Sequence, residues 1–64
     1  MIINGYDSAE MRFNETLIVP KDAIIKFVDL PRMPGCYIAT VNAIEKIYIY
    51  DSEKTRIEKE LGGN

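Results

Sequence analysis

The chain has 64 residues, of which 47% are hydrophobic and 28% charged, with a formal net charge of -2; this composition is typical of one small globular domain. One cysteine and no histidine exclude a disulfide framework and argue against structural zinc and against Ser-His or Cys-His nucleophile pairs. We therefore expect a single domain over residues 1–64 with no cofactor, no metal and no enzymatic activity.

The small size of the domain requires stabilisation beyond its own core. A chain of this length buries only about 60% of the surface that its unfolded form exposes, and one such core contributes roughly 3–5 kcal/mol. Without disulfides or metal, self-association is the remaining source of stability.

The distribution of charge and apolar residues predicts a cytoplasmic protein. The longest uncharged stretch, Met33–Ile44, is too short to span a bilayer and contains Pro34 and Gly35. We expect no signal peptide, because Met1–Ile3 is followed at once by polar residues. The acidic pI near 4.9 argues against a general nucleic-acid binder but leaves room for a local basic patch.

The first 15 residues give the weakest pattern. Asn4-Gly5 is a residue pair typical of a hairpin turn, which leaves Met1–Ile3 as a short first strand. A strand over Glu10–Phe13 is the alternative.

Two strands with a turn between them are predicted next. Thr16–Val19 is β-branched and apolar, and it ends at Pro20, which has no amide proton for a strand ladder. Pro20–Asp22 predicts a tight turn. Ala23–Asp29 then alternates in the manner of a strand whose second face is only partly exposed.

The next loop and the last two strands are marked by turn residues. Leu30–Gly35 ends in Pro-Gly, the signal for a type II turn with a positive φ at the glycine. Cys36–Val41 is a strand, Asn42–Glu45 turns the chain, and Lys46–Tyr50 has one aliphatic and one phenolic side. The alternation in the strands assigns the core to Leu17, Val19, Ile25, Phe27, Ile38, Ile47 and Ile49.

A short helix over Ser52–Leu61 is predicted at the end of the chain. Asp51 or Ser52 is suited to accept hydrogen bonds from its first amides, and Gly62 is suited to the C′ position. Its apolar stripe consists of Ile57 and Leu61 alone, so the helix must dock on another element.

Several stretches together resemble the carbon storage regulator family of bacterial translational regulators. Met11–Val19 is similar to the family's arginine-arginine-valine-glycine-glutamate-threonine-leucine stretch, and Val41–Ala43 resembles its valine-asparagine-alanine. Ala23–Val28 resembles its third strand, and Ile47–Ile57 its fifth strand and the start of its helix. Residues 1–10 match poorly.

The resemblance implies a mostly β fold, in which a small barrel-like antiparallel sheet of five strands precedes a C-terminal helix. It also implies an interlocked homodimer in which edge strands pair with the partner, and binding of GGA-containing RNA loops. Carried over residue by residue, the RNA-binding positions are Arg12, Ile49 and Tyr50. Asp51 stands where the family has an arginine, Met11 replaces the first arginine of the pair, and Ile44 replaces a proline.

The sequence leaves two functions open. One is a small RNA-binding translational regulator with an altered site, in which Tyr48 and Tyr50 stack on bases; both tyrosines are equally explained as strand surface residues. The other is a small acidic protein-binding module, such as a phage-type inhibitor. Arg12 is either an RNA contact or a partner of Glu10 or Glu15.

Two further features have competing readings. Arg32 and Met33, flanked by prolines, form either a recognition tip or a plain surface loop. Cys36 is expected to be an apolar strand residue rather than a reactive thiol.

Overall fold

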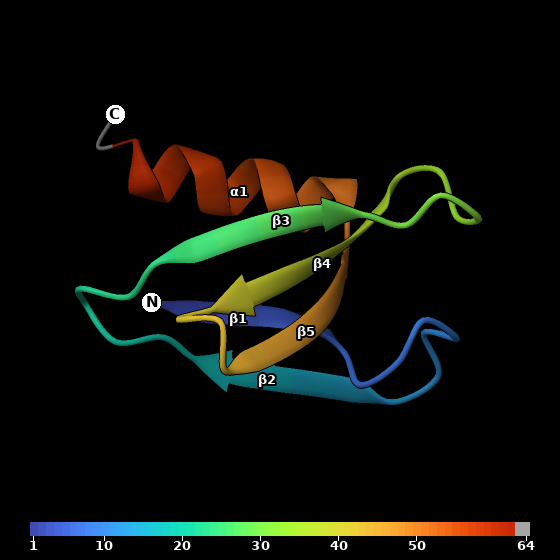
Figure 1. The fold of residues 1–64 in the computed structure, drawn as a ribbon, viewed down its shortest axis with the longest axis horizontal. Coiled ribbons are helices and arrows are strands. Elements are labelled where there is room, and N and C mark those ends of the chain that lie inside the picture. Colours follow the sequence, from blue (N-terminus) through green and yellow to red (C-terminus); the bar gives the residue numbers. More distant parts are fainter. Residues whose placement is uncertain (63–64) are drawn as a thin grey trace.

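The computed structural model describes residues 1–62, which form one antiparallel sheet of five strands followed by a helix (Figure 1). The mostly β fold predicted from the sequence is therefore confirmed. In the sheet the strands lie in the order β2-β1-β5-β4-β3. The elements are β1 (Ile2–Tyr6), β2 (Asn14–Ile18), β3 (Ile25–Asp29), β4 (Cys36–Val41), β5 (Glu45–Tyr50) and α1 (Asp51–Leu61).

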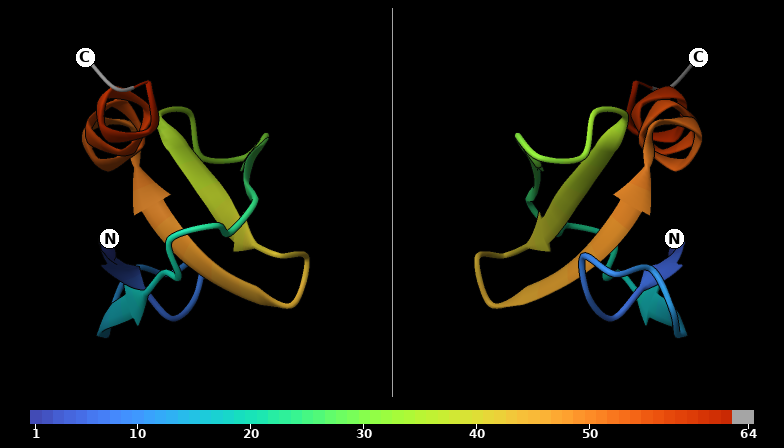
Figure 2. Two further views of the ribbon diagram at one scale, coloured as in Figure 1. Left: turned by 90° about the vertical axis from the view of Figure 1, so that its left-hand side faces the viewer. Right: turned by 90° about the vertical axis from the view of Figure 1, so that its right-hand side faces the viewer.

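The sheet consists of two well-paired parts joined at one narrow seam. β1 and β2 form a hairpin with continuous pairing from Ile2↔Ile18 to Tyr6↔Asn14, and β3, β4 and β5 form a three-stranded meander. Between the two parts, the ladder of β1 and β5 contains the single pair Tyr6↔Tyr48. The sheet curls strongly when seen end-on but does not close into a barrel (Figure 2).

Gly5 allows the close approach of β1 to β5 at this seam. A Cβ atom at Gly5 would collide with the Tyr48 carbonyl oxygen and would lie 2.9 Å from side-chain carbons of Ile47 and Ile49. The expectation that Asn4-Gly5 forms a hairpin turn is therefore wrong, because both residues lie inside β1. The alternative strand over Glu10–Phe13 is also wrong, since this segment lies in the connection between β1 and β2.

The core lies between the curled sheet and α1. Its fully buried residues come from β1, β4, β5, α1 and the residue that follows β2, and partly buried side chains from β2 and β3 pack against them. The buried members are Ile3, Val19, Ala39, Val41, Ile47, Ile49 and Ile57, and Leu17, Ile25 and Phe27 are among those packed on them.

Ile38 is a correction to the predicted core. In β4 the residues that face the core are Tyr37, Ala39 and Val41, so Ile38 lies on the opposite face and is only half-buried. Both faces of this strand carry apolar residues, because the buried Cys36 shares the face of Ile38. Alternation alone therefore did not distinguish the inner face from the outer one. The burial of Cys36 confirms the prediction that it is an apolar strand residue.

Three of the predicted turns are present. The Ala23 amide donates to the Pro20 carbonyl at 3.2 Å, which closes the turn after β2. The Cys36 amide donates to the Met33 carbonyl at 3.0 Å and Gly35 has φ +86°, which confirms the type II geometry. The turn between β4 and β5 places Asn42 and Ala43 at φ 54° and 57°, a left-handed conformation that is unusual for alanine.

The helix forms as predicted but its caps differ from the prediction. Its N-cap is Tyr50, without a side-chain cap, because β5 runs directly into α1; the Asp51 amide donates instead to the Gly35 carbonyl at 2.7 Å. Gly62 is the C-cap and is right-handed, with φ -72°, rather than left-handed. Leu61 is exposed, so Ile57 alone anchors the helix in the core. Within residues 1–62 no helix has the length and apolarity needed to cross a membrane.

Candidate functional site

The three residues that the family resemblance assigns to RNA binding have different positions. Arg12 is exposed in the connection between β1 and β2 and takes part in no ion pair within residues 1–62, so it pairs with neither Glu10 nor Glu15. Tyr50 is 44% exposed at the end of β5. Ile49 is completely buried and faces the core, so its side chain offers no surface to a ligand.

Tyr50 is held by a second tyrosine. Alternation along each strand places Tyr6, Tyr48 and Tyr50 on the face of the sheet opposite the core, and Tyr6 pairs directly with Tyr48. The rings of Tyr6 and Tyr50 meet edge to face, with centroids 5.5 Å apart and planes at 80°, a favoured geometry for two aromatic rings. The exposed phenol is thus fixed in orientation.

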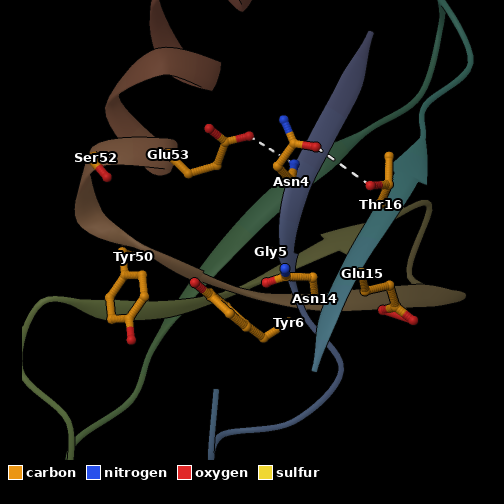
Figure 3. Close-up of a pocket in the computed structure, with 9 residues that line it drawn as sticks. All are labelled: Asn4, Gly5, Tyr6, Asn14, Glu15, Thr16, Tyr50, Ser52 and Glu53. Atoms are coloured by element: carbon orange, nitrogen blue, oxygen red, sulfur yellow. Dashed lines mark hydrogen bonds between the residues drawn. The ribbon is translucent and has the colours of Figure 1, made fainter. Parts of the chain in front are cut away.

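The tyrosine pair borders an open cavity of about 410 Å³. β1, β2, the end of β5 and the first turn of α1 form its wall, as the close-up shows (Figure 3). No lysine or arginine lies among the lining residues, which are Asn4, Gly5, Tyr6, Asn14, Glu15, Thr16, Tyr50, Ser52 and Glu53. We call this the tyrosine cavity.

Most of the polar side chains that line the tyrosine cavity carry no charge. The Thr16 hydroxyl donates to the Asn4 side-chain oxygen at 3.5 Å, which leaves the Asn4 amide nitrogen to donate to a ligand. Glu15 alternates with the outward-facing Asn14 and Thr16, so its carboxylate is directed away from the tyrosines in Figure 3. Asparagine amides and hydroxyls beside aromatic rings are the groups that bind the edges and faces of flat heterocycles.

The second carboxylate of the cavity, Glu53, is already bound. Its two oxygens accept from the Arg56 guanidinium at 2.8 and 2.6 Å, and one of them also accepts from the Asn4 backbone amide at 2.9 Å. The hydrogen bonds from Arg56 lower the pKa of the Glu53 carboxyl, against the opposing effect of partial burial, and the bond from Asn4 lowers it further. Glu53 is therefore ionised and structural.

Sequence reasoning identified Tyr50 but missed Asn4, Tyr6, Asn14 and Thr16. The signal for two of them was the alternation in β1, where Asn4 and Tyr6 flank Gly5 on the face opposite Ile3. That pattern was hidden by reading Asn4-Gly5 as a turn. Asn14 and Thr16 fall on β2, whose start lies two residues before the predicted one.

The remaining candidates lie outside the cavity. Tyr48 is half-buried in the middle of β5, with the Lys46 ammonium 5.9 Å from its ring centroid. Arg32 is exposed and Met33 half-buried in the loop before β4, and neither lines the cavity. In residues 1–62 no three metal-binding side chains lie close enough together to hold an ion.

Comparison with family models, with curated proteins and with solved structures finds no match to this chain.

Proposed function

We propose that the chain is a small RNA-binding translational regulator of the carbon storage regulator type, with weakened phosphate contacts. The observation that carries the proposal is Tyr50, which is exposed, held edge-on by Tyr6 and bordered by the polar tyrosine cavity. Stacking of an unpaired base on an aromatic side chain is worth roughly 1–3 kcal/mol. The role is one of binding rather than catalysis.

The charges around the tyrosine cavity support recognition of bases more than of phosphates. Arg12 is an exposed cation in the connection that joins two lining residues, Tyr6 and Asn14, and lies two residues before Asn14 in the sequence. Asp51, next to Tyr50, repels a phosphate where the family has an arginine. The resulting affinity for RNA is modest and depends on unstacked bases in a loop.

A homodimer is part of the proposal, and the edges of the sheet support it. The Val19 amide donates to the Met1 carbonyl, and the Asp7 amide donates to the Phe13 carbonyl. These hydrogen bonds define which residues of β2 face β1, and the backbone groups of Thr16 and Ile18 therefore point to the free edge of β2. Ile18 is 76% exposed, and an unpaired edge with an exposed isoleucine favours pairing with another chain. The dimer acts in the cytoplasm, where Cys36 stays reduced.

The apolar surface beside the β2 edge also favours a second candidate, a protein-binding module. Ile2 and Ile18 lie directly opposite each other and are 51% and 76% exposed. A strand of another protein added to this edge would cover both side chains. In that case the acidic chain binds a regulator or a host protein instead of RNA.

A titration of the full chain with a GGA hairpin at two salt concentrations tests the proposal. Binding that weakens when Tyr50 is replaced by leucine, and that weakens with salt, is the expected result. The matched control is Phe13→Leu, because Phe13 is an aromatic residue outside the cavity that is even more exposed than Tyr50. Absence of binding at the lower salt concentration contradicts the RNA function and leaves the protein-binding module.

A further inference from the structure

The face of the sheet opposite the core, here called the outer face, carries a distinctive set of side chains. Alternation and the pairing register define its members. Those of the β3-β4-β5 meander are Lys26, Val28, Cys36, Ile38, Thr40, Lys46, Tyr48 and Tyr50, and those of the hairpin are Ile2, Asn4, Tyr6, Asn14, Thr16 and Ile18.

None of the strand residues that alternate to the outer face is acidic, although the chain has a net charge of -2. The Glu53 carboxylate of α1 lies beside Asn4 at one end of the face, where it is paired with Arg56. The strands do carry three acidic residues, Glu15, Asp29 and Glu45, but all three alternate to the other face. The charged groups that remain on the outer face are the ammonium groups of Lys26 and Lys46. The sheet therefore has a cationic face within an acidic protein.

The two lysines lie in one row across three strands. Lys26 pairs with Thr40, and Thr40 pairs with Lys46. Because neighbouring strands are about 4.8 Å apart, the two lysine backbones lie about 10 Å apart. Both side chains are exposed, and neither forms an ion pair within residues 1–62.

A row containing aromatic residues lies next to the lysine row. Val28 pairs with Ile38, Ile38 with Tyr48, and Tyr48 with Tyr6. The two rows are about 7 Å apart along the strands, and the Lys46 ammonium is 5.9 Å from the Tyr48 ring centroid. This arrangement continues to Tyr50 and the tyrosine cavity.

We infer that the outer face binds a single-stranded RNA segment, with Lys26 and Lys46 on its phosphates and Tyr48 and Tyr6 against its bases. Charge complementarity carries the inference, because the strand residues of this face supply two cations and no carboxylate to a polyanion. The aromatic row beside the lysines supplies surfaces on which bases can stack. The inference rests on the proposed RNA function. It extends the binding surface from the tyrosine cavity across the meander, to residues that the resemblance does not assign.

Replacing both lysines with glutamine tests this surface. The double variant Lys26→Gln/Lys46→Gln is compared with Lys21→Gln/Lys59→Gln, which makes the same change in net charge at exposed lysines outside the outer face. The probe is an unstructured single-stranded RNA of about 12 nucleotides, labelled for fluorescence anisotropy. Affinities are measured at several salt concentrations, and circular dichroism verifies that each variant is folded.

The outer-face variant is expected to lose about tenfold in affinity, and the magnitude of its salt slope should fall by about 1.4, the value for two phosphate contacts on a single strand. The control variant should retain both. A second pair of variants, Tyr48→Phe and Tyr48→Leu, tests the contribution of the aromatic ring of Tyr48. RNA affinity should be preserved with phenylalanine and weakened with leucine.

Equal losses in the two double variants overturn the outer-face site, because net charge alone then explains them. RNA binding that depends on Tyr50 and Arg12 but not on Lys26 and Lys46 also overturns it, while leaving the proposed function intact. Failure of the unaltered chain to bind either this probe or the GGA hairpin removes the proposed function as well. If the Lys26→Gln/Lys46→Gln variant loses affinity for an acidic peptide but keeps its affinity for RNA, the outer face binds a protein partner and the inference is contradicted.

Discussion

Glu53 and Arg56, one helical turn apart on α1, together bind the backbone of β1. The Glu53 carboxylate accepts from the Asn4 amide at 2.9 Å, and the Arg56 guanidinium donates to the Ile2 carbonyl at 2.6 Å. These backbone groups face the region where β5 has diverged from β1, so two side chains take the place of a neighbouring strand. The salt bridge between them, at 2.6 Å, fixes both in position.

Substitution of Glu53 by glutamine should therefore destabilise the fold and change its response to acid. The Glu53 side chain is 16% exposed, and loss of its charge-assisted hydrogen bonds should cost on the order of 1–2 kcal/mol. Because the folded-state pKa of Glu53 is lowered, its contribution is present above the ordinary carboxyl pKa and is lost as the pH falls through the lowered value. Thermal unfolding across this acid range should show a shallower loss of stability in Glu53→Gln than in the unaltered chain.

Glu58→Gln is the matched control for that measurement. Glu58 forms an ion pair with Lys54 on the same helix, at 3.1 Å, but its side chain is 52% exposed. Exposed pairs of this kind contribute less than about 1 kcal/mol. Equal effects of the two substitutions would contradict a special role for Glu53.

Gly5→Ala should be the most damaging glycine substitution in residues 1–62. The added methyl group meets the Tyr48 backbone carbonyl and the fully buried side chains of Ile47 and Ile49. Overpacking of this kind costs about 1–3 kcal/mol, which chemical denaturation would detect. Gly35→Ala is the comparison, because its Cβ meets nothing within 4 Å and its cost comes from φ +86° alone. If Gly5→Ala loses no more stability than Gly35→Ala, the close approach of β1 to β5 at Gly5 is refuted.

Ala43→Gly should stabilise the protein. Ala43 is left-handed at φ 57° in the turn between β4 and β5, a conformation that glycine adopts without steric cost. Removing the steric cost stabilises the folded state, whereas glycine also increases the conformational entropy of the unfolded chain. The first effect should be the larger, so the free energy of unfolding should rise by about 0.5–1 kcal/mol. Ala9→Gly, at a loop position without a positive φ, should give no gain in the denaturation midpoint. A destabilised Ala43→Gly variant would show that the left-handed backbone of Ala43 is not strained.

Asp51→Arg should strengthen RNA binding if the proposed function is correct. Asp51 is exposed beside Tyr50; its backbone amide donates to the Gly35 carbonyl, and its side chain makes no hydrogen bond within residues 1–62. Its charge lies in the first turn of α1, so the substitution should cost the helix about 0.3–1 kcal/mol without unfolding the chain. The change removes a repulsive charge and adds a phosphate contact, which should raise affinity for a GGA hairpin by about 1–3 kcal/mol and steepen the salt dependence. Unchanged binding at low salt would argue against RNA as the ligand.

The homodimer is tested by sedimentation equilibrium at micromolar concentration. A dimer mass is expected for the unaltered chain. Ile18→Lys, which places a charge at the exposed edge of β2, should shift the equilibrium to monomer. Because self-association is expected to stabilise the domain, the variant should also unfold at a lower temperature than the unaltered chain. A monomer mass for the stable, unaltered chain would refute the dimer.

The meander and the helix were predictable because their signals are local. Alternation defines β3 to β5, and Pro34-Gly35 specifies its turn in the sequence itself. Gly5 is different, because its role depends on Tyr48, which is distant in sequence. A glycine required by long-range packing has the same local signature as one required by a turn, so the first strand was predicted to end at Ile3 although β1 continues to Tyr6. Three of the nine residues that line the tyrosine cavity, Asn4, Gly5 and Tyr6, lie on β1 and were missed for this reason.

The position of Tyr50 in the candidate site was predictable from the pattern of β5, but its fixed orientation was not. That orientation depends on Tyr6, which reaches Tyr50 only through the pairing of β1 with β5. Ile49 was assigned to RNA binding by the family resemblance, although its side chain faces the core. A matched position in a family pattern does not show on which face of the sheet the side chain lies. The complete burial of Ile49 followed from alternation with Tyr50.

The attachment of β1 to α1 makes a single amide proton an internal reporter. The Asn4 amide is bound by a side chain 49 residues away in the sequence rather than by a neighbouring strand. Its exchange with solvent deuterium therefore measures how often the helix lifts from the sheet, independently of global unfolding. Amides of the meander, which are held by strand ladders on β4, should exchange more slowly. Any ligand or partner that changes the docking of α1 will be detectable at that one proton.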